Sequence, residues 1–237
     1  VDPQRFIITA MAEDADHGLW ALAVGDPTLY HFDRARQQFA AFANTSLSAE
    51  QRSRANLRTL AVAPDGRVWL GGAAVHSAFD RHTQRFTSYL NDPAQPGGLP
   101  RAEIQAIHPD AHGTIWLATN SGLVAFDPLH AASTTYTRKD GLANDSVSGI
   151  LEDAQGVLWL STNGGISRFV PQQRSFHTYD KSDGIQGNQF TVARAGRDGT
   201  LFFGGRDGLT AFQPTKLALR KYQPAGVLTA LKIAHKP

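Results

Sequence analysis

The sequence predicts an all-β fold assembled from repeated four-stranded antiparallel units. One observation is a recurring Gly-x-apolar-Trp-apolar segment, whose aromatic residue falls at positions 20, 69, 116, 159 and 202. A second is the alternation of side chains around it, as in Leu158 and Leu160 against Trp159, which has the period of a strand. A third is the glycine-rich turns between apolar segments. Repeats of 43 to 49 residues with four strands each are typical of β-propeller blades.

Within each unit the four strands follow from the order of apolar segments and turns. The first strand precedes an acid pair such as Glu152-Asp153, and a glycine-containing hairpin turn then leads to the tryptophan strand. A polar turn such as 162–165 leads to a third strand, and a further turn leads to an outer strand. The third strands carry Phe32, Phe79, Phe126, Phe169 and Phe212, and the outer strands carry Phe42, Tyr89, Tyr136 and Tyr179. In the fifth unit Phe212 is followed by Gln213-Pro214 and then a basic tail, so we expect this unit to lack an outer strand.

The units are predicted to span about 5–44, 56–90, 102–137, 145–180 and 189–215, so that blades occupy residues 1–215. Propellers usually close with about 4 to 8 blades. Five could close on themselves, but the first unit begins abruptly and the fifth is incomplete. We therefore expect a fragment of a larger propeller of about seven blades.

The composition excludes several classes of protein. The 237 residues include no cysteine, which excludes a disulfide scaffold, a CxxC metal site and a cysteine nucleophile. No apolar run is long enough to span a membrane, so membrane contact is expected only through regions outside this chain. Five of the 23 basic residues follow the last acid, Asp207, and form a basic tail. Because nucleic-acid binding needs a basic face within the domain, no nucleic-acid partner is expected.

The repeat resembles the two-component regulator propeller family in three places. These are the segment 113–128, the connections 140–145 and 183–188, and the closing unit 187–214. The resemblance implies the periplasmic, extracytoplasmic sensor region of a hybrid two-component sensor kinase. It also implies that a β-sandwich domain named for three tyrosines follows the last blade. Residues 216–237 would then be a basic linker and the first strand of that sandwich, cut off soon after it starts.

The sequence departs from the family pattern at single positions. His17 replaces glycine in the first unit, and Phe202 replaces tryptophan in the last. The second unit, at 72–75, lacks the glycine before its third strand.

No catalytic residue, metal site or cofactor is expected. His108 and His112 lie four residues apart, but in a strand and turn rather than on one helical face that could hold zinc. The acid pairs Glu13-Asp14 and Glu152-Asp153 recur at one repeat position, where an aspartate caps its own turn. A catalytic pair is needed once and not in every blade, so we interpret these acids as structural. The glycine pairs lack the Lys-Ser/Thr and the helix of a phosphate loop.

The remaining candidate site is set by geometry. We expect the loops between blades, and those between the second and third strands, to emerge on one face around the axis. Arginine and asparagine there would supply planar donors for sugar hydroxyls or carboxylates, although Asn-x-Gly is also a turn former. The candidate ligand-binding residues are His76, Arg101, Asn120, Asn144, Asp145, Asn163, Asn188, Gln189 and Arg206.

Three functions remain open. The leading hypothesis is a non-catalytic sensor domain for a small molecule or oligosaccharide, with the saccharide implied by the resemblance alone. The enzyme alternative is a propeller lyase or hydrolase, which needs a metal or a His–acid pair in the central funnel. The third is a structural or protein-interaction propeller that self-associates as a dimer, because an incomplete propeller leaves an unpaired edge.

Overall fold

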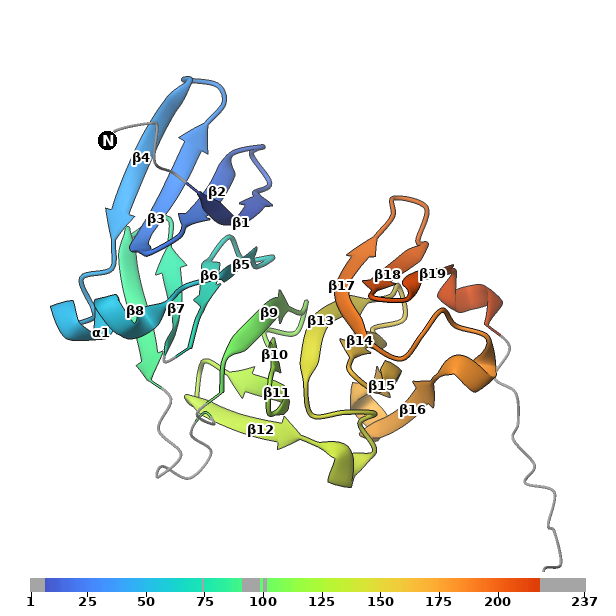
Figure 1. The fold of residues 1–237 in the computed structure, drawn as a ribbon. Coiled ribbons are helices and arrows are strands. Elements are labelled where there is room, and N and C mark those ends of the chain that lie inside the picture. The colour runs from blue at the N-terminus through green and yellow to red at the C-terminus, as the bar shows by residue number, and fades with distance from the viewer. Residues whose placement is uncertain (1–6, 74, 91–98, 100–101, 218–237) are drawn as a thin grey trace, which may run out of the picture.

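The computed structural model describes residues 7–73, 75–90, 99 and 102–217, which form five antiparallel sheets along an arc (Figure 1). The first two sheets contain β1 (Ile8–Glu13), β2 (Leu19–Ala23), β3 (Asp26–Asp33), β4 (Gln38–Ala43), β5 (Thr59–Val62), β6 (Val68–Gly71), β7 (Val75–Asp80) and β8 (Arg85–Leu90). The next two contain β9 (Ile104–Pro109), β10 (Ile115–Thr119), β11 (Gly122–Asp127), β12 (Ala132–Tyr136), β13 (Val147–Glu152), β14 (Leu158–Thr162), β15 (Gly165–Val170) and β16 (Ser175–Tyr179). The fifth contains β17 (Phe190–Ala195), β18 (Leu201–Gly205) and β19 (Gly208–Phe212).

This architecture confirms the predicted all-β propeller of four-stranded antiparallel blades. Within the described residues the fifth sheet has three strands. An outer strand would begin after residue 217, outside the described residues, so the expectation that it is missing stays a prediction. The total blade number and the domain division remain predictions, and the expected sandwich strand at 224–233 lies outside the described residues. The first strands of successive sheets pack side by side, β1 with β5, β5 with β9, β9 with β13 and β13 with β17. They therefore form the inner row of the arc.

The hairpin between the first two strands needs a residue in the left-handed backbone region. Gly66, Gly113 and Gly156 occupy this position with φ values of 82°, 89° and 74°. His17 takes the same position in the first blade with φ of 62°. A side chain is tolerated there at a modest cost in strain, so the departure from the glycine pattern leaves the turn intact.

The core lies in the seams between blades, because each tryptophan packs against the third strand of the following blade. All four tryptophans are at most 5% exposed. The ring pairs, by centroid distance, are Trp20–Phe79 at 5.6 Å, Trp69–Phe126 at 6.1 Å, Trp116–Phe169 at 5.7 Å and Trp159–Phe212 at 5.0 Å. Such rings each bury roughly 150–250 Å², so the seams supply most of the hydrophobic stabilisation. A blade is thus stabilised by its neighbours more than by itself.

The same packing leaves an apolar face at each end of the arc. On the first end face Met11 is 61% exposed and Phe39 is 75% exposed. On the last end face Val192 and Leu209 are each 59% exposed, beside the half-buried Phe202 in the tryptophan position. No sheet of the described residues covers either face, because the blades that pack on these two sheets lie on their other sides.

A short helix, α1 (Ala49–Ala55), joins the first two blades and was not predicted. Ser48 accepts a hydrogen bond from the backbone N–H of Gln51, whose side chain accepts in turn from Ser48 N–H. Ser-x-x-Gln is the sequence pattern of such a capping box and could have revealed the helix. Leu47 and Leu57 on either side pack into the first seam and hold the helix against it.

Candidate functional site

The loops expected on one face do lie together. The backbone N–H of Asn120, in the turn between β10 and β11, donates to the carbonyl of Glu103, just before β9. Asn163, between β14 and β15, donates in the same way to Ser146, just before β13. These bonds confirm that the second turn of a blade and the connection entering it share one end of the sheet. We call this end the loop face.

Three candidate residues lie exposed in second turns on the loop face: Asn120, Asn163 and Arg206. The Asn120 side-chain oxygen accepts a hydrogen bond from the Glu103 N–H at 3.2 Å, which fixes that turn to the inner strand. Each of the three residues belongs to a different blade, so together they present donors from neighbouring blades. Their contact with a ligand stays a prediction.

The candidates on the connections between blades shape those connections. Asp145 and Asn188 occupy the same repeat position, and each accepts a backbone hydrogen bond from seven residues earlier, at 2.7 Å and 3.1 Å. Asn144 accepts from the Ser146 N–H at 2.9 Å, and Gln189 is exposed at the start of β17. A structural role for three of them is therefore clear, and ligand contact remains a prediction.

The sequence predicts that His76 lies in a loop, and this prediction is wrong. It lies within β7, is 0% exposed, and packs among Tyr89 and Phe126 at ring-centroid distances of 4.9 Å and 4.6 Å. Strand β7 begins one residue earlier, at Val75, so the missing glycine in this unit does not lengthen the loop. Burial lowers the pKa of His76 to about 3, and neither ring nitrogen has a hydrogen-bond partner. The ninth candidate, Arg101, lies outside the described residues.

The recurring aspartate does cap its turn, and it also binds the tryptophan of its own blade. Asp153 Oδ1 accepts from the N–H groups of Gln155 and Val157, and its Oδ2 accepts from Trp159 Nε1 at 2.8 Å. Asp14 and Asp110 make the same bonds, with Oδ2 to tryptophan distances of 2.8 Å and 2.9 Å. We call these three hydrogen bonds the clasp. The sequence signal that could have predicted it is the spacing of six residues between the aspartate and the tryptophan.

The second blade lacks the clasp, because Ala63 replaces the aspartate six residues before Trp69. Trp69 Nε1 is consequently buried with no hydrogen-bond acceptor. The alanine backbone still makes the two turn hydrogen bonds of the other blades, to Arg67 at 2.8 Å and from Gly66 at 2.9 Å.

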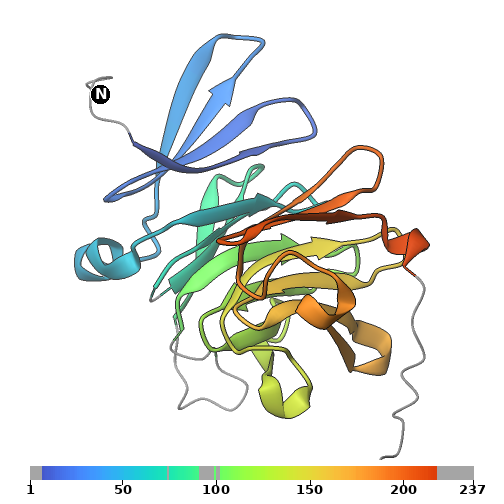
Figure 2. The same cartoon turned by 45° about the vertical axis from the view of Figure 1, so that its right-hand side comes forward.

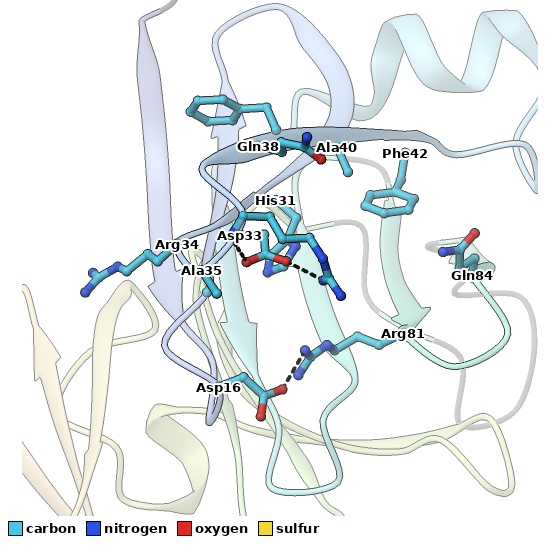
Figure 3. A pocket seen from close by; sticks show the side chains of 13 residues that line it. Asp16, His31, Asp33, Arg34, Ala35, Gln38, Ala40, Phe42, Arg81 and Gln84 are labelled. Atoms are coloured by element: carbon cyan, nitrogen blue, oxygen red, sulfur yellow. Dashed lines mark hydrogen bonds and ion pairs between the residues drawn. The ribbon is translucent and has the colours of Figure 1, made fainter.

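A pocket of about 560 Å³ lies between the first two blades, at the end opposite the loop face (Figure 3). It is lined mainly by three turns, at residues 16–18, 33–36 and 81–84, together with side chains of β3 and β4. Figure 2 shows the β3–β4 hairpin projecting away from the other sheets. We call this cavity the seam pocket.

Ion pairs from both blades border the seam pocket. Arg36 contacts Asp33 at 2.7 Å, and Arg81 contacts Asp16 at 2.9 Å and the buried Asp14 at 3.4 Å. Burial acts to raise the pKa of Asp14, but hydrogen bonds from Trp20 and from the Gly18 N–H and the charge of Arg81 outweigh it, so this pKa is lowered.

His31 closes the back of the seam pocket. Its ring stacks on Trp20 with centroids 4.2 Å apart, and Nε2 lies 3.3 Å from Asp14 Oδ2 without forming a hydrogen bond. A Cβ at Gly18 would collide with this nitrogen, so glycine at position 18 is what admits the ring.

Other acid and histidine pairs occur near the turn ends of the inner strands. His108 Nε2 lies 2.6 Å from Glu152, and His17 Nδ1 lies 2.8 Å from Glu13. Among the described residues, no group of three or more histidines and acids could hold a metal ion. None of the helices described here has the length and apolar character that crossing a membrane requires.

Comparisons place this arrangement among known proteins. Residues 141–164 match the two component regulator propeller family. The extracellular domain of a hybrid two component system from B. thetaiotaomicron has a TM-score of 0.70 and 26% identity, covering 88% of this chain and 28% of that one. A second such domain from the same organism has a TM-score of 0.69 and 17% identity, covering 90% of this chain and 30% of that one.

The fold also occurs in an enzyme. Virginiamycin B lyase from Staphylococcus aureus has a TM-score of 0.65 and 15% identity, covering 89% of this chain and 71% of that one. No curated protein sequence matches the chain. The chain spans less than a third of the two extracellular domains. Its repeat and its fold together confirm the predicted resemblance to the two component regulator propeller family, seen in extracellular domains of hybrid two component systems.

Proposed function

We propose that this chain is part of the periplasmic sensing region of a hybrid two-component receptor, and that it binds a small molecule or oligosaccharide without altering it chemically. The observation that carries the proposal is the 26% identity to an extracellular domain of such a system across 88% of this chain. The family match at residues 141–164 supports it, because these residues form a connection and two strands of one blade.

The side chains of the loop face suit reversible binding of a polar ligand. Asn120, Asn163 and Arg206 are exposed polar side chains held on turns between rigid strands. Amide and guanidinium groups offer donors in fixed planes, which suits hydroxyl or carboxylate oxygens. A ligand that contacts turns of neighbouring blades would favour one relative arrangement of those blades and so bias a module beyond them.

A catalytic role has weaker support. The likeness to virginiamycin B lyase, at 15% identity, concerns the fold alone. The His108–Glu152 and His17–Glu13 pairs lie at the turn ends opposite the loop face, the first between two neighbouring blades and the second within one hairpin of the first blade. In each pair the carboxylate contacts its histidine, an arrangement that occurs in structural ion pairs as well as in catalytic acid–base pairs.

Calorimetric titration of the purified chain against a glycan panel tests the proposal. Saturable heat is expected with at least one glycan, and Asn163→Ala and Arg206→Ala should each reduce it. Arg197→Ala is the matched control, because Arg197 is an exposed arginine at the opposite end of the same blade as Arg206. A flat response to the whole panel, or an equal loss in the control, would count against ligand binding at the loop face.

Self-association is a second candidate function, and the two end faces favour it. Exposed apolar side chains stand on both end faces, and no sheet of the described residues covers them: Phe39 and Met11 on one, and Val192 and Leu209 on the other. We propose that a second copy of the chain covers such a face. Light scattering should then give a mass that rises toward the dimer with concentration, whereas a monodisperse monomer throughout would contradict this.

A further inference from the structure

We propose that the seam pocket is a binding site for an oxyanion, namely the carboxylate or sulfate group of a small acidic molecule, held between Arg36 of the first blade and Arg81 of the second. The site is separate from the loop face and does not depend on the sensor function proposed above.

Two of the acids around the pocket already accept hydrogen bonds from donors close to them in the chain. Asp33 Oδ1 accepts from the backbone N–H of Arg36 at 3.0 Å, and its Oδ2 accepts from the Arg36 guanidinium at 2.7 Å. Asp14 is fully buried, and its two oxygens accept from turn N–H groups and from Trp20 Nε1. These carboxylates are thus occupied by their own turns.

The guanidinium groups, in contrast, keep donors in excess. Each guanidinium carries five N–H bonds. The Arg36 guanidinium donates one hydrogen bond to Asp33, and that of Arg81 donates one to Asp16 and makes a longer ion pair with Asp14. Figure 3 shows Arg81 and Asp33 facing each other across the pocket. The pocket lining holds three arginines against two aspartates, so its formal net charge is positive and favours an anion. Guanidinium is the side chain best suited to a carboxylate or sulfate.

Arg81 is also held in place before any ligand arrives. Its side chain is only 26% exposed, and its guanidinium carbon lies 5.8 Å from the centre of the Trp20 ring. Partial burial, the ring contact and the Asp16 pair restrict its rotamers, so less entropy is lost on binding. Arg36 comes from the first blade, and its side chain is 78% exposed.

The size of the seam pocket and the side chains of its remaining wall favour a ligand larger than a bare ion. About 560 Å³ lies in the range of small-molecule sites. Phe42 and Ala40 provide an apolar surface on β4, and His31 closes the back. The pocket therefore fits a compact organic acid or sulfate ester, with the charged group between the two arginines and the body against β4.

The indole N–H signals of a ¹⁵N-labelled sample give a local readout. Trp20 Nε1 donates to Asp14, which contacts Arg81, so an anion at Arg81 should shift the Trp20 signal. Trp116 and Trp159 make the same bond to aspartate in other blades and serve as internal controls. The probes are glucuronate, sulfate and neutral glucose, titrated at constant ionic strength.

A saturable shift of Trp20 alone with glucuronate or sulfate supports the proposal, and whichever anion produces it identifies the carboxylate or sulfate source. Arg36→Gln and Arg81→Gln should each weaken the apparent affinity by about tenfold, the worth of one charged hydrogen bond. Arg197→Ala, an exposed arginine in the turn between β17 and β18 of the fifth blade, should leave the titration unchanged. Because Arg36 is largely exposed, its substitution tests binding without risk to folding, and unshifted Trp116 and Trp159 signals verify the fold of Arg81→Gln.

Two results would overturn the proposal: no Trp20 shift with either anion, or an equal shift with glucose. A titration of Arg36→Gln identical to that of the parent would do the same. A negative result in this assay would not bear on the glycan titration at the loop face, and a negative glycan titration would not bear on the seam pocket. The two assays use different residues at opposite ends of the blades.

Discussion

His76 should make the protein less stable in mild acid. Its ring is fully buried, both nitrogens lack partners, and burial lowers its pKa from 6.5 to about 3. The unfolded chain keeps the ordinary value of about 6.5. Below that pH the unfolded chain gains a proton that the folded protein does not bind. The stability is therefore fully present above pH 6.5 and is lost as the pH falls from 6.5 toward 3.

The loss follows from these two pKa values. Each pH unit between them costs at most about 1.4 kcal/mol, so the free energy of unfolding should fall by about 2 kcal/mol between pH 7 and pH 5 through His76 alone. His76→Phe keeps a ring among Tyr89 and Phe126 and removes the titrating group. It should unfold at a higher urea concentration at pH 7 and lose about 2 kcal/mol less than the parent on going to pH 5.

Urea unfolding followed by tryptophan fluorescence at both pH values measures this difference. His112→Gln is the matched control, because it replaces an exposed histidine in a turn of another blade. If His76→Phe loses as much stability as the parent between pH 7 and pH 5, His76 is not buried as the neutral form and the reasoning fails.

Three further predictions concern the seams and the ends. Asp153→Ala leaves Trp159 Nε1 and two turn N–H groups without an acceptor and should lower the free energy of unfolding by about 3 kcal/mol, seen as a lower Tm; an unchanged Tm would refute the clasp. Ala63→Asp should raise this free energy by about 1 kcal/mol by giving Trp69 Nε1 its missing acceptor, and a destabilised variant would show that the turn cannot place the carboxylate. Phe39→Ser, which removes the most exposed aromatic side chain of the first end face, should reduce the average mass in light scattering at high concentration; an unchanged mass would exclude that face.

The repeat made the fold predictable because its information is local. Alternation around Trp159 sets the two faces of a strand, and a glycine such as Gly156 sets the hairpin before it. Both signals return in phase, so each copy supports the interpretation of the others.

The parts that could not be predicted depend on contacts between blades. His76 differs from its loop prediction because its environment is made by Phe126 of the next blade. The seam pocket joins Asp16 and Arg81, which are 65 residues apart and whose pairing no local pattern records. The periodicity of the sequence places a residue in a strand or a turn. It does not give the size of a seam, because that size depends on how far two neighbouring sheets diverge.

Hydrogen–deuterium exchange of the chain, with and without the pooled glycan panel, tests the central claim of ligand sensing most directly. If a glycan binds the loop face, exchange should become slower in the turns at 119–122, 162–165 and 205–208, which belong to three different blades. Unchanged exchange at all three turns in the presence of the pool would contradict it.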